Sequence, residues 1–113
     1  MTALSINPEE RLALLRTFAP FADCIEEVRL FGSRATGHAS PGSDIDLALF
    51  GDIDALVERR LWTDLDESSL PVAVDLVVYN RIDSTLLKQH IDAVSVPLFN
   101  RSDLAAANDL AAS

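Results

Sequence analysis

The stretch that decides the fold is Leu30-Phe31-Gly32-Ser33-Arg34-Ala35-Thr36-Gly37, followed after a short loop by Ser43-Asp44-Ile45-Asp46-Leu47. It predicts a short strand, a Gly-Ser turn that opens a brief helix, and a second strand that begins with two carboxylates. Ten residues separate Ser33 from Asp44. Because successive side chains of a strand alternate between its faces, Asp44 and Asp46 are expected to project the same way.

This arrangement indicates phosphate and metal chemistry. Two neighbouring carboxylates repel each other unless a cation lies between them, and Mg²⁺ with substrate phosphates is the usual occupant. A glycine such as Gly32 lets the backbone approach a ligand closely, the Ser33 hydroxyl adds a donor, and N–H groups at a helix start attract phosphate. Arg34 is a candidate phosphate ligand, or else a salt-bridge partner that fixes the loop. Ser43 is a candidate ligand too, with a local capping role as the alternative.

A P-loop is excluded. Gly32 and Gly37 have the spacing of that motif, but His38-Ala39 stands where it needs Lys followed by Ser or Thr.

The two segments resemble the signature of the minimal nucleotidyltransferases of the DNA polymerase β-like superfamily. Within it they are most similar to the small MNT-type domain that is the antitoxin of HEPN ribonuclease toxins. The resemblance covers roughly residues 10–100. It implies an α/β (α+β type) fold with a polymerase β-like nucleotidyltransferase core: a small mixed sheet of three or four strands, flanked by helices mainly on one face. The family adds a third carboxylate from a later strand, and Asp75 fits that place.

The resemblance also implies an activity, namely transfer of AMP from ATP to a hydroxyl, with a tyrosine of a partner HEPN toxin as the expected acceptor. Asp44, Asp46 and Asp75 would be the catalytic and metal-binding residues and would hold two Mg²⁺ ions. Asp75 would also accept the proton of the attacking hydroxyl. Gly32 and Ser33 would hold the β- and γ-phosphates.

Two other functions remain open. The chain could be a binding module that neutralises the toxin by complex formation alone, with residual carboxylates. It could also be a small-molecule nucleotidyltransferase that acts as a homodimer. Larger relatives carry a further domain that helps to bind the acceptor, and 113 residues leave no room for one. We therefore expect another protein chain to supply the acceptor surface.

Composition and length limit the possible fold, location and partners. The length and the 49% apolar content predict one globular domain over residues 1–113, with a core at about 8–100 and an acidic, Ala-rich tail at 101–113. No apolar run has the length of a membrane span, and the single Cys24 favours the reducing cytoplasm. The net charge of −9 argues against direct nucleic-acid binding and favours a basic protein partner or a nucleotide delivered with Mg²⁺.

Periodicity and turn signals place the remaining elements. Helices are expected at 8–20, 34–38, 54–66 and 84–94, and one more helical stripe is expected in the tail. Strands are expected at 28–31, 44–50 and 73–79, and a short extended segment at 96–99. The first two strands are expected to be antiparallel neighbours. The third is nearly all apolar apart from Asp75, which predicts a central strand covered on both faces. His38 and His90 are interpreted as surface residues, Cys24 as a small packed apolar group and Tyr79 as structural.

Overall fold

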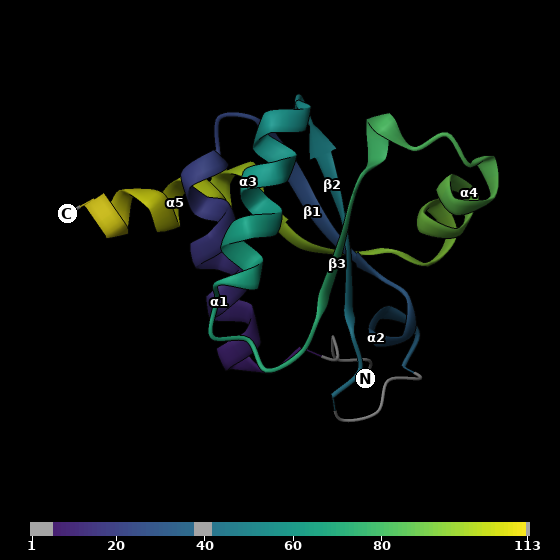
Figure 1. The fold of residues 1–113 in the computed structure, drawn as a ribbon, viewed down its shortest axis with the longest axis horizontal. Helices are drawn as coiled ribbons and strands as arrows, with labels where there is room; N and C mark the ends of the chain where they lie inside the picture. Colours follow the sequence, from purple (N-terminus) through teal and green to yellow (C-terminus); the bar gives the residue numbers. More distant parts are fainter. Residues whose placement is uncertain (1–5, 38–41, 113) are drawn as a thin grey trace.

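A four-stranded mixed sheet forms the centre of the computed structural model, which describes residues 6–37 and 42–112 (Figure 1). The strands are β1 (Ile25–Phe31), β2 (Ile45–Gly51), β3 (Val74–Val78) and β4 (Val96–Asn100), in the spatial order β3-β2-β1-β4. β1 is antiparallel to β2 and to β4, whereas β2 and β3 are parallel. The predicted mixed sheet is therefore confirmed, as are its antiparallel first two strands. His38 lies outside the described residues.

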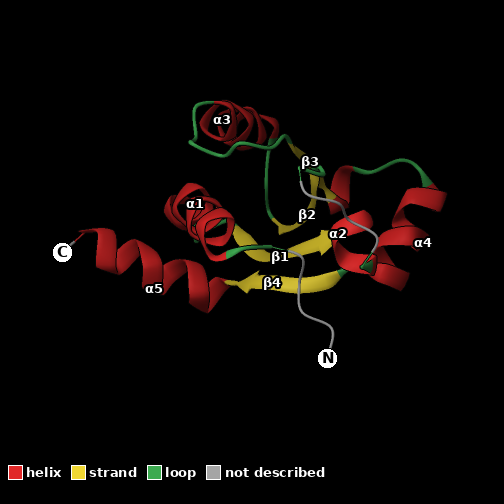
Figure 2. Ribbon diagram, turned by 90° about the horizontal axis from the view of Figure 1, so that it is seen from below, coloured by secondary structure: helices red, strands yellow, loops and turns green. Residues whose placement is uncertain are grey.

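Helices cover both faces of this sheet. They are α1 (Pro8–Phe18), α2 (Ser33–Thr36), α3 (Ala55–Asp66), α4 (Thr85–Val94) and α5 (Arg101–Ala112), with short 3₁₀ turns η1 (Ala19–Phe21) and η2 (Tyr79–Arg81). Figure 2 shows α1, α3 and α5 on one side, and α4 with the short α2 on the other. Three helices thus share the expected face, and α4 covers the opposite one. None of the helices in the described part of the chain has the length and apolar character that a membrane crossing needs.

The start of α1 shows how local sequence fixes an element. Asn7 is the N-cap, and its Oδ1 accepts a hydrogen bond of 2.8 Å from the Glu10 N–H. The Glu10 carboxylate accepts one of 3.2 Å in return from the Asn7 N–H. This reciprocal capping box satisfies two backbone donors that the helix itself cannot pair. It also holds the Glu10 side chain at one place near the start of the helix.

β3 lies at an edge of the sheet, so the prediction of a central strand was wrong. Helices do cover both of its faces, as expected: Leu76 and Val78 pack into the main core, and Val77 packs under α4. The nearly continuous apolar run therefore reflects helices on two faces and not strands on two sides. Asp75 is the exposed residue within this strand.

The core has two parts. The main cluster fills the space between the sheet and α1, α3 and α5, and it includes the fully buried Phe18, Leu47 and Leu104. Leu104 anchors α5, so residues 101–112 form a packed helix, while the division of the chain into domain core and tail stays a prediction. Cys24 packs at the margin of the same cluster, as expected.

A smaller cluster holds α4 on the other face. Its buried members are Phe31, Ala48 and Ile91. Phe50 and Tyr79 stack at 4.6 Å beside them, and the Tyr79 hydroxyl donates to Asp92 at 2.8 Å, in keeping with a structural role. On the same face, Asp46 and Asp75 lie in register with Phe31 on the neighbouring strands β2 and β3.

Candidate functional site

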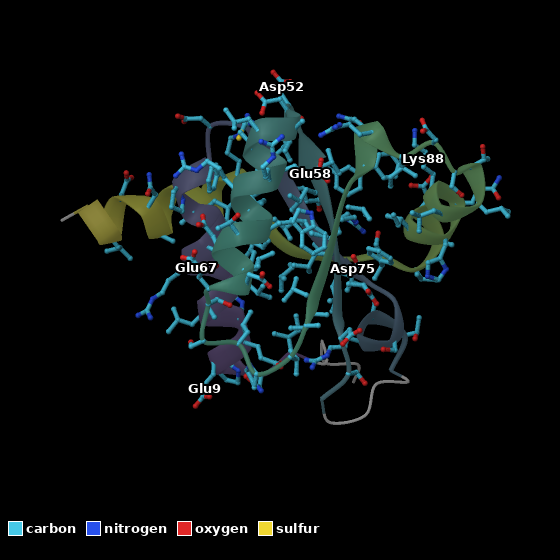
Figure 3. All side chains as sticks on the ribbon, in the orientation of Figure 1. Glu9, Asp52, Glu58, Glu67, Asp75 and Lys88 are labelled. Carbon is cyan, nitrogen blue, oxygen red and sulfur yellow. The ribbon has the colours of Figure 1, made fainter. Side chains whose placement is uncertain are left out.

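Three side chains from three neighbouring strands form one row on the face that carries α4. The strand register pairs Phe31 with Asp46, and Asp46 with Asp75. Directly opposed residues project to the same side of a sheet, with strands about 4.8 Å apart, so the two carboxylates are immediate neighbours. Figure 3 shows Asp75 on this side of β3. The row brings together two of the three predicted carboxylates.

The electrostatics of the row centre on Asp46. Partial burial raises the pKa of Asp46 above its ordinary value, and the negative charges of Asp75 and Asp44 raise it further. His90 acts in the opposite direction and lowers the pKa. Asp44 itself is exposed and directly precedes β2. The charges of Asp44 and Asp75 are therefore both felt at Asp46, and a cation bound there would relieve the repulsion among the three carboxylates.

The donor set suits a hard cation, because carboxylate oxygens are what Mg²⁺ prefers. Within residues 6–37 and 42–112, however, no three carboxylate, imidazole or thiol groups converge closely enough to hold a metal ion by themselves. Mg²⁺ is usually bound through one or two carboxylates and keeps waters and substrate phosphates as its other ligands. An incomplete set of protein ligands fits that pattern, and the metal-binding role of the carboxylates stays a prediction.

Gly32 forms the wall of the site opposite Asp46. Its backbone has φ +73° and ψ −156°, a region open essentially to glycine alone. A Cβ atom at this position would lie 2.2 Å from Oδ2 of Asp46, which is a severe overlap. The sequence indicated that Gly32 allows a ligand to approach the backbone. In the structure, the group that lies close to the Gly32 backbone is the Asp46 carboxylate.

A buried ion pair supports the loop that leads to the carboxylates. The Arg34 guanidinium donates to the Glu10 carboxylate at 2.7 Å, and both side chains are only 6% exposed. It also donates twice to the Ser43 carbonyl, at 3.1 Å from Nε and 2.6 Å from Nη2. Because Ser43 precedes Asp44, Arg34 ties the capped start of α1 to the chain that enters β2. These are the contacts of the loop-fixing alternative; the phosphate roles of Arg34 and Ser43, like that of Ser33 at the start of α2, stay predictions.

Glu10→Gln is expected to lower the free energy of unfolding by about 1–2 kcal/mol, since a buried guanidinium loses its counter-charge while the amide keeps one hydrogen bond. Glu9→Gln is the matched control, because the exposed Glu9 is the adjacent acid in the first turn of α1. Urea denaturation of both variants measures the difference. Equal stabilities of the two variants would show that the ion pair contributes nothing.

His90 lies beside the carboxylate row, a position that the sequence did not predict. It is exposed, as expected of a surface residue, but its ring lies edge-on to Phe31 with the ring centroids 6.1 Å apart. It is also near enough to Asp46 to lower its pKa. No local signal predicts this, because the position of α4 over the sheet depends on contacts of Ile91 and its neighbours that are distant in sequence.

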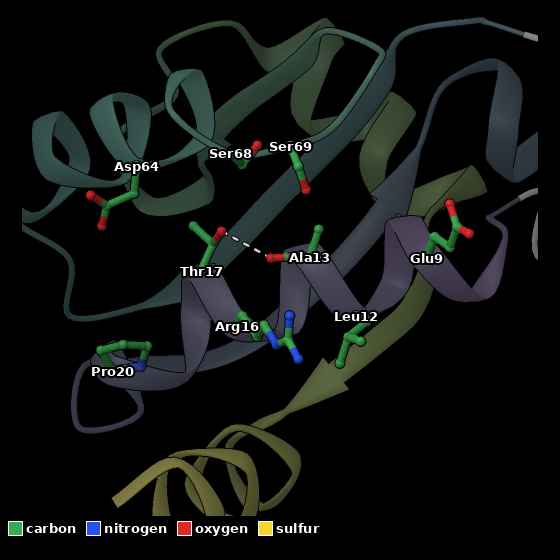
Figure 4. Close-up of a pocket in the computed structure, with 9 residues that line it drawn as sticks. All are labelled: Glu9, Leu12, Ala13, Arg16, Thr17, Pro20, Asp64, Ser68 and Ser69. Atoms are coloured by element: carbon green, nitrogen blue, oxygen red, sulfur yellow. Dashed lines mark hydrogen bonds between the residues drawn. The ribbon is translucent and has the colours of Figure 1, made fainter.

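A separate groove lies on the far side of the sheet. It has a volume of about 530 Å³ and runs between α1 and α3 (Figure 4). Its lining includes Arg16, Thr17, Asp64 and Ser68, but not Asp44, Asp46 or Asp75. This hollow is therefore not part of the candidate site.

Together, the fold and the site define a nucleotidyltransferase domain. The family model described as "Polymerase beta, Nucleotidyltransferase" matches residues 15–104, and the chain belongs to this family. A curated relative, the "Probable protein adenylyltransferase MntA" of Haemophilus influenzae, is 40% identical over 76 residues. That match covers 66% of this chain and 66% of the relative, so it spans about two thirds of each.

Solved structures agree with this assignment. A toxin–antitoxin with AMP-PNP is similar over 90% of this chain and 86% of the other, with a TM-score of 0.65 and 23% identity, which supports the fold alone. A mutant of the toxin–antitoxin MntA-HpeT is 25% identical, covering 95% of this chain and 87% of the other with a TM-score of 0.60. The family and fold predicted from the Gly-Ser turn and the Asp-x-Asp strand are confirmed.

Proposed function

We propose that this nucleotidyltransferase transfers AMP from ATP to a tyrosine hydroxyl of a partner HEPN toxin and so acts as its antitoxin. The observation that carries the proposal is the pairing of Asp46 with Asp75 beside the Gly32 turn, in a chain of this family. The similarity to a protein named as an adenylyltransferase supports AMP as the transferred group. The similarity to the 25% identical toxin–antitoxin structure supports a toxin as the partner.

Each residue of the site has a role in this proposal. Asp44, Asp46 and Asp75 hold Mg²⁺, which when bound neutralises the phosphate charge that develops during transfer. The acceptor oxygen attacks the α-phosphorus of ATP, and a new O–P bond forms. The bond from that phosphorus to the bridging oxygen breaks, and pyrophosphate leaves. Asp75 takes the proton of the acceptor hydroxyl, which its exposed position at the edge of the sheet permits.

The Gly-Ser turn positions the leaving group. Gly32 brings the backbone against Asp46 without a side chain between them, so phosphates held by the turn lie next to the carboxylates. We assign the Ser33 hydroxyl as a donor to the β- and γ-phosphates. Arg34 and Ser43 act through the loop, since the Arg34 guanidinium already binds Glu10 and the Ser43 carbonyl.

The direct test is mass spectrometry of the toxin after incubation with this chain, ATP and Mg²⁺. The expected result is a toxin whose tyrosine carries AMP, and omission of ATP or addition of a chelator is the control. One observation favours a second function: the net charge of −9 suits tight association with a basic RNA-binding surface without any chemistry. An unmodified toxin that is nonetheless neutralised would establish that non-catalytic function instead.

ATP with Mg²⁺ is expected to raise the melting temperature, because a ligand that binds only the folded state stabilises it by mass action. The double change Asp44→Asn/Asp46→Asn should abolish this response. Without ligand the double variant should melt no lower than the wild type, since the raised pKa of Asp46 shows that its ionised form is disfavoured in the fold. Differential scanning fluorimetry measures both effects. If the melting temperature of the wild type did not change when ATP and Mg²⁺ were added together, the proposed site would be contradicted.

A further inference from the structure

His90 stands beside the carboxylates without a role in the reaction described above. It extends from α4 and packs edge-on against Phe31, with an interplanar angle of 79°. Phe31 is both the cross-strand partner of Asp46 and the residue before Gly32. The imidazole therefore lies where the Gly-Ser turn and the carboxylate row meet.

Packing of α4 does not require this histidine. Ile91, Leu87 and Val94 attach the helix to the sheet, whereas His90 is exposed. Neither ring nitrogen is hydrogen-bonded to another residue in the described part of the chain, yet an imidazole always has at least one N–H to donate. His90 thus places a hydrogen-bond donor against Phe31, the cross-strand partner of Asp46.

The order of the side chains in the row indicates whether His90 lies nearer to the nucleotide or to the acceptor. Phe31 and Asp75 lie on opposite sides of Asp46, so His90 is at the Phe31 end and the edge strand β3 is at the other. In the proposed reaction Asp75 takes the acceptor's proton, which puts the acceptor at the open edge. The nucleotide phosphates then lie toward the turn and the Phe31 end.

We propose that His90 is a nucleotide-binding residue, whose imidazole N–H donates a hydrogen bond to a phosphate oxygen of ATP. This inference rests on the proposed function, and it adds a second wall to the site. The Gly32–Ser33 turn contacts the phosphate chain from one side, and α4 contacts it from the other. α4 is thereby part of the nucleotide site as well as a cover for the sheet.

Isothermal titration with AMP-PNP and Mg²⁺ tests the assignment. His90→Ala and His90→Phe should each weaken binding about tenfold, the effect of losing one hydrogen bond to a charged group. His90→Phe keeps an aromatic ring against Phe31 and so isolates the donor. His90→Asn, which retains an N–H donor, should recover part of the affinity. Gln89→Ala is the control, because Gln89 is the exposed neighbour on the same helix.

The outcomes separate this inference from the proposed function. A wild-type chain that binds no AMP-PNP would contradict the proposed function itself. A wild type that binds, with His90→Ala binding equally well, would overturn the role of His90. Full affinity in His90→Phe would show that the ring alone suffices and would overturn the donor. In transfer assays the expected result is a raised KM for ATP with little change in kcat, and a fall in kcat with unchanged affinity would contradict a binding role.

Discussion

Asp75→Ala is expected to lower the rate of AMP transfer roughly a thousandfold, because loss of one carboxylate from a metal-assisted transfer costs about 4 kcal/mol of transition-state stabilisation. The fold should survive, since Asp75 is exposed on an edge strand. Toxin binding should change little, because binding energy concentrates in a few central anchors of an interface. Mass spectrometry of the co-expressed toxin should find AMP with the wild-type chain and none with Asp75→Ala.

Asp64→Ala is the matched control for this experiment. Asp64 is an exposed carboxylate on α3, on the other side of the sheet, so the change alters the net charge by the same amount. Transfer by Asp64→Ala should match the wild type. If Asp75→Ala still modified the toxin at the wild-type rate, Asp75 would have no part in the chemistry.

Gly32→Ala should reduce transfer at least a hundredfold, since the added methyl group cannot coexist with the present position of the Asp46 carboxylate. Either Asp46 moves or the turn moves, and a misplacement of about 1 Å in a catalytic site costs that much in rate. The unusual backbone angles of Gly32 add a stability cost of about 1–3 kcal/mol. Transfer assays and urea denaturation on the same protein measure the two effects.

Gly37→Ala separates the steric effect from backbone strain. Gly37 ends α2 in the left-handed conformation with φ +81°, and a Cβ there would meet nothing within 4 Å among the described atoms. This control should lose a little stability and keep most of its activity. Equal losses of activity in the two variants would mean that strain of the turn, and not the displacement of Asp46, accounts for the effect at Gly32.

The sequence predicted the parts of the site that depend on local geometry. Strand alternation put Asp46 on the face away from the main core, and periodicity with turn signals located the start of α1 at residue 8. The Glu10–Arg34 pair joins residues 24 positions apart, and no local pattern reveals such a partner. Arg34 therefore remained open between a phosphate contact and a salt bridge until the two segments were seen side by side.

The error about the position of β3 also has a physical reason. An apolar run such as Val72-Ala73-Val74-Asp75-Leu76-Val77-Val78 shows that both faces of a strand are covered, but it does not show how many strands flank it. Here helices cover both faces of a strand that, among residues 6–37 and 42–112, pairs with β2 alone. His90 is exposed, as the sequence predicted, but a helical pattern gives only the buried side of α4 and not what lies next to its exposed side.

The edge position of β3 has a consequence for solubility. An exposed edge offers unpaired backbone groups to a strand of another molecule, and an apolar strand makes such aggregation easier. Asp75 is the charged residue in the middle of this apolar segment. Its carboxylate therefore also discourages edge-to-edge association between copies of the chain, because two such strands would bring like charges together. Asp75 would keep this second role even in a variant of the chain that no longer catalysed transfer.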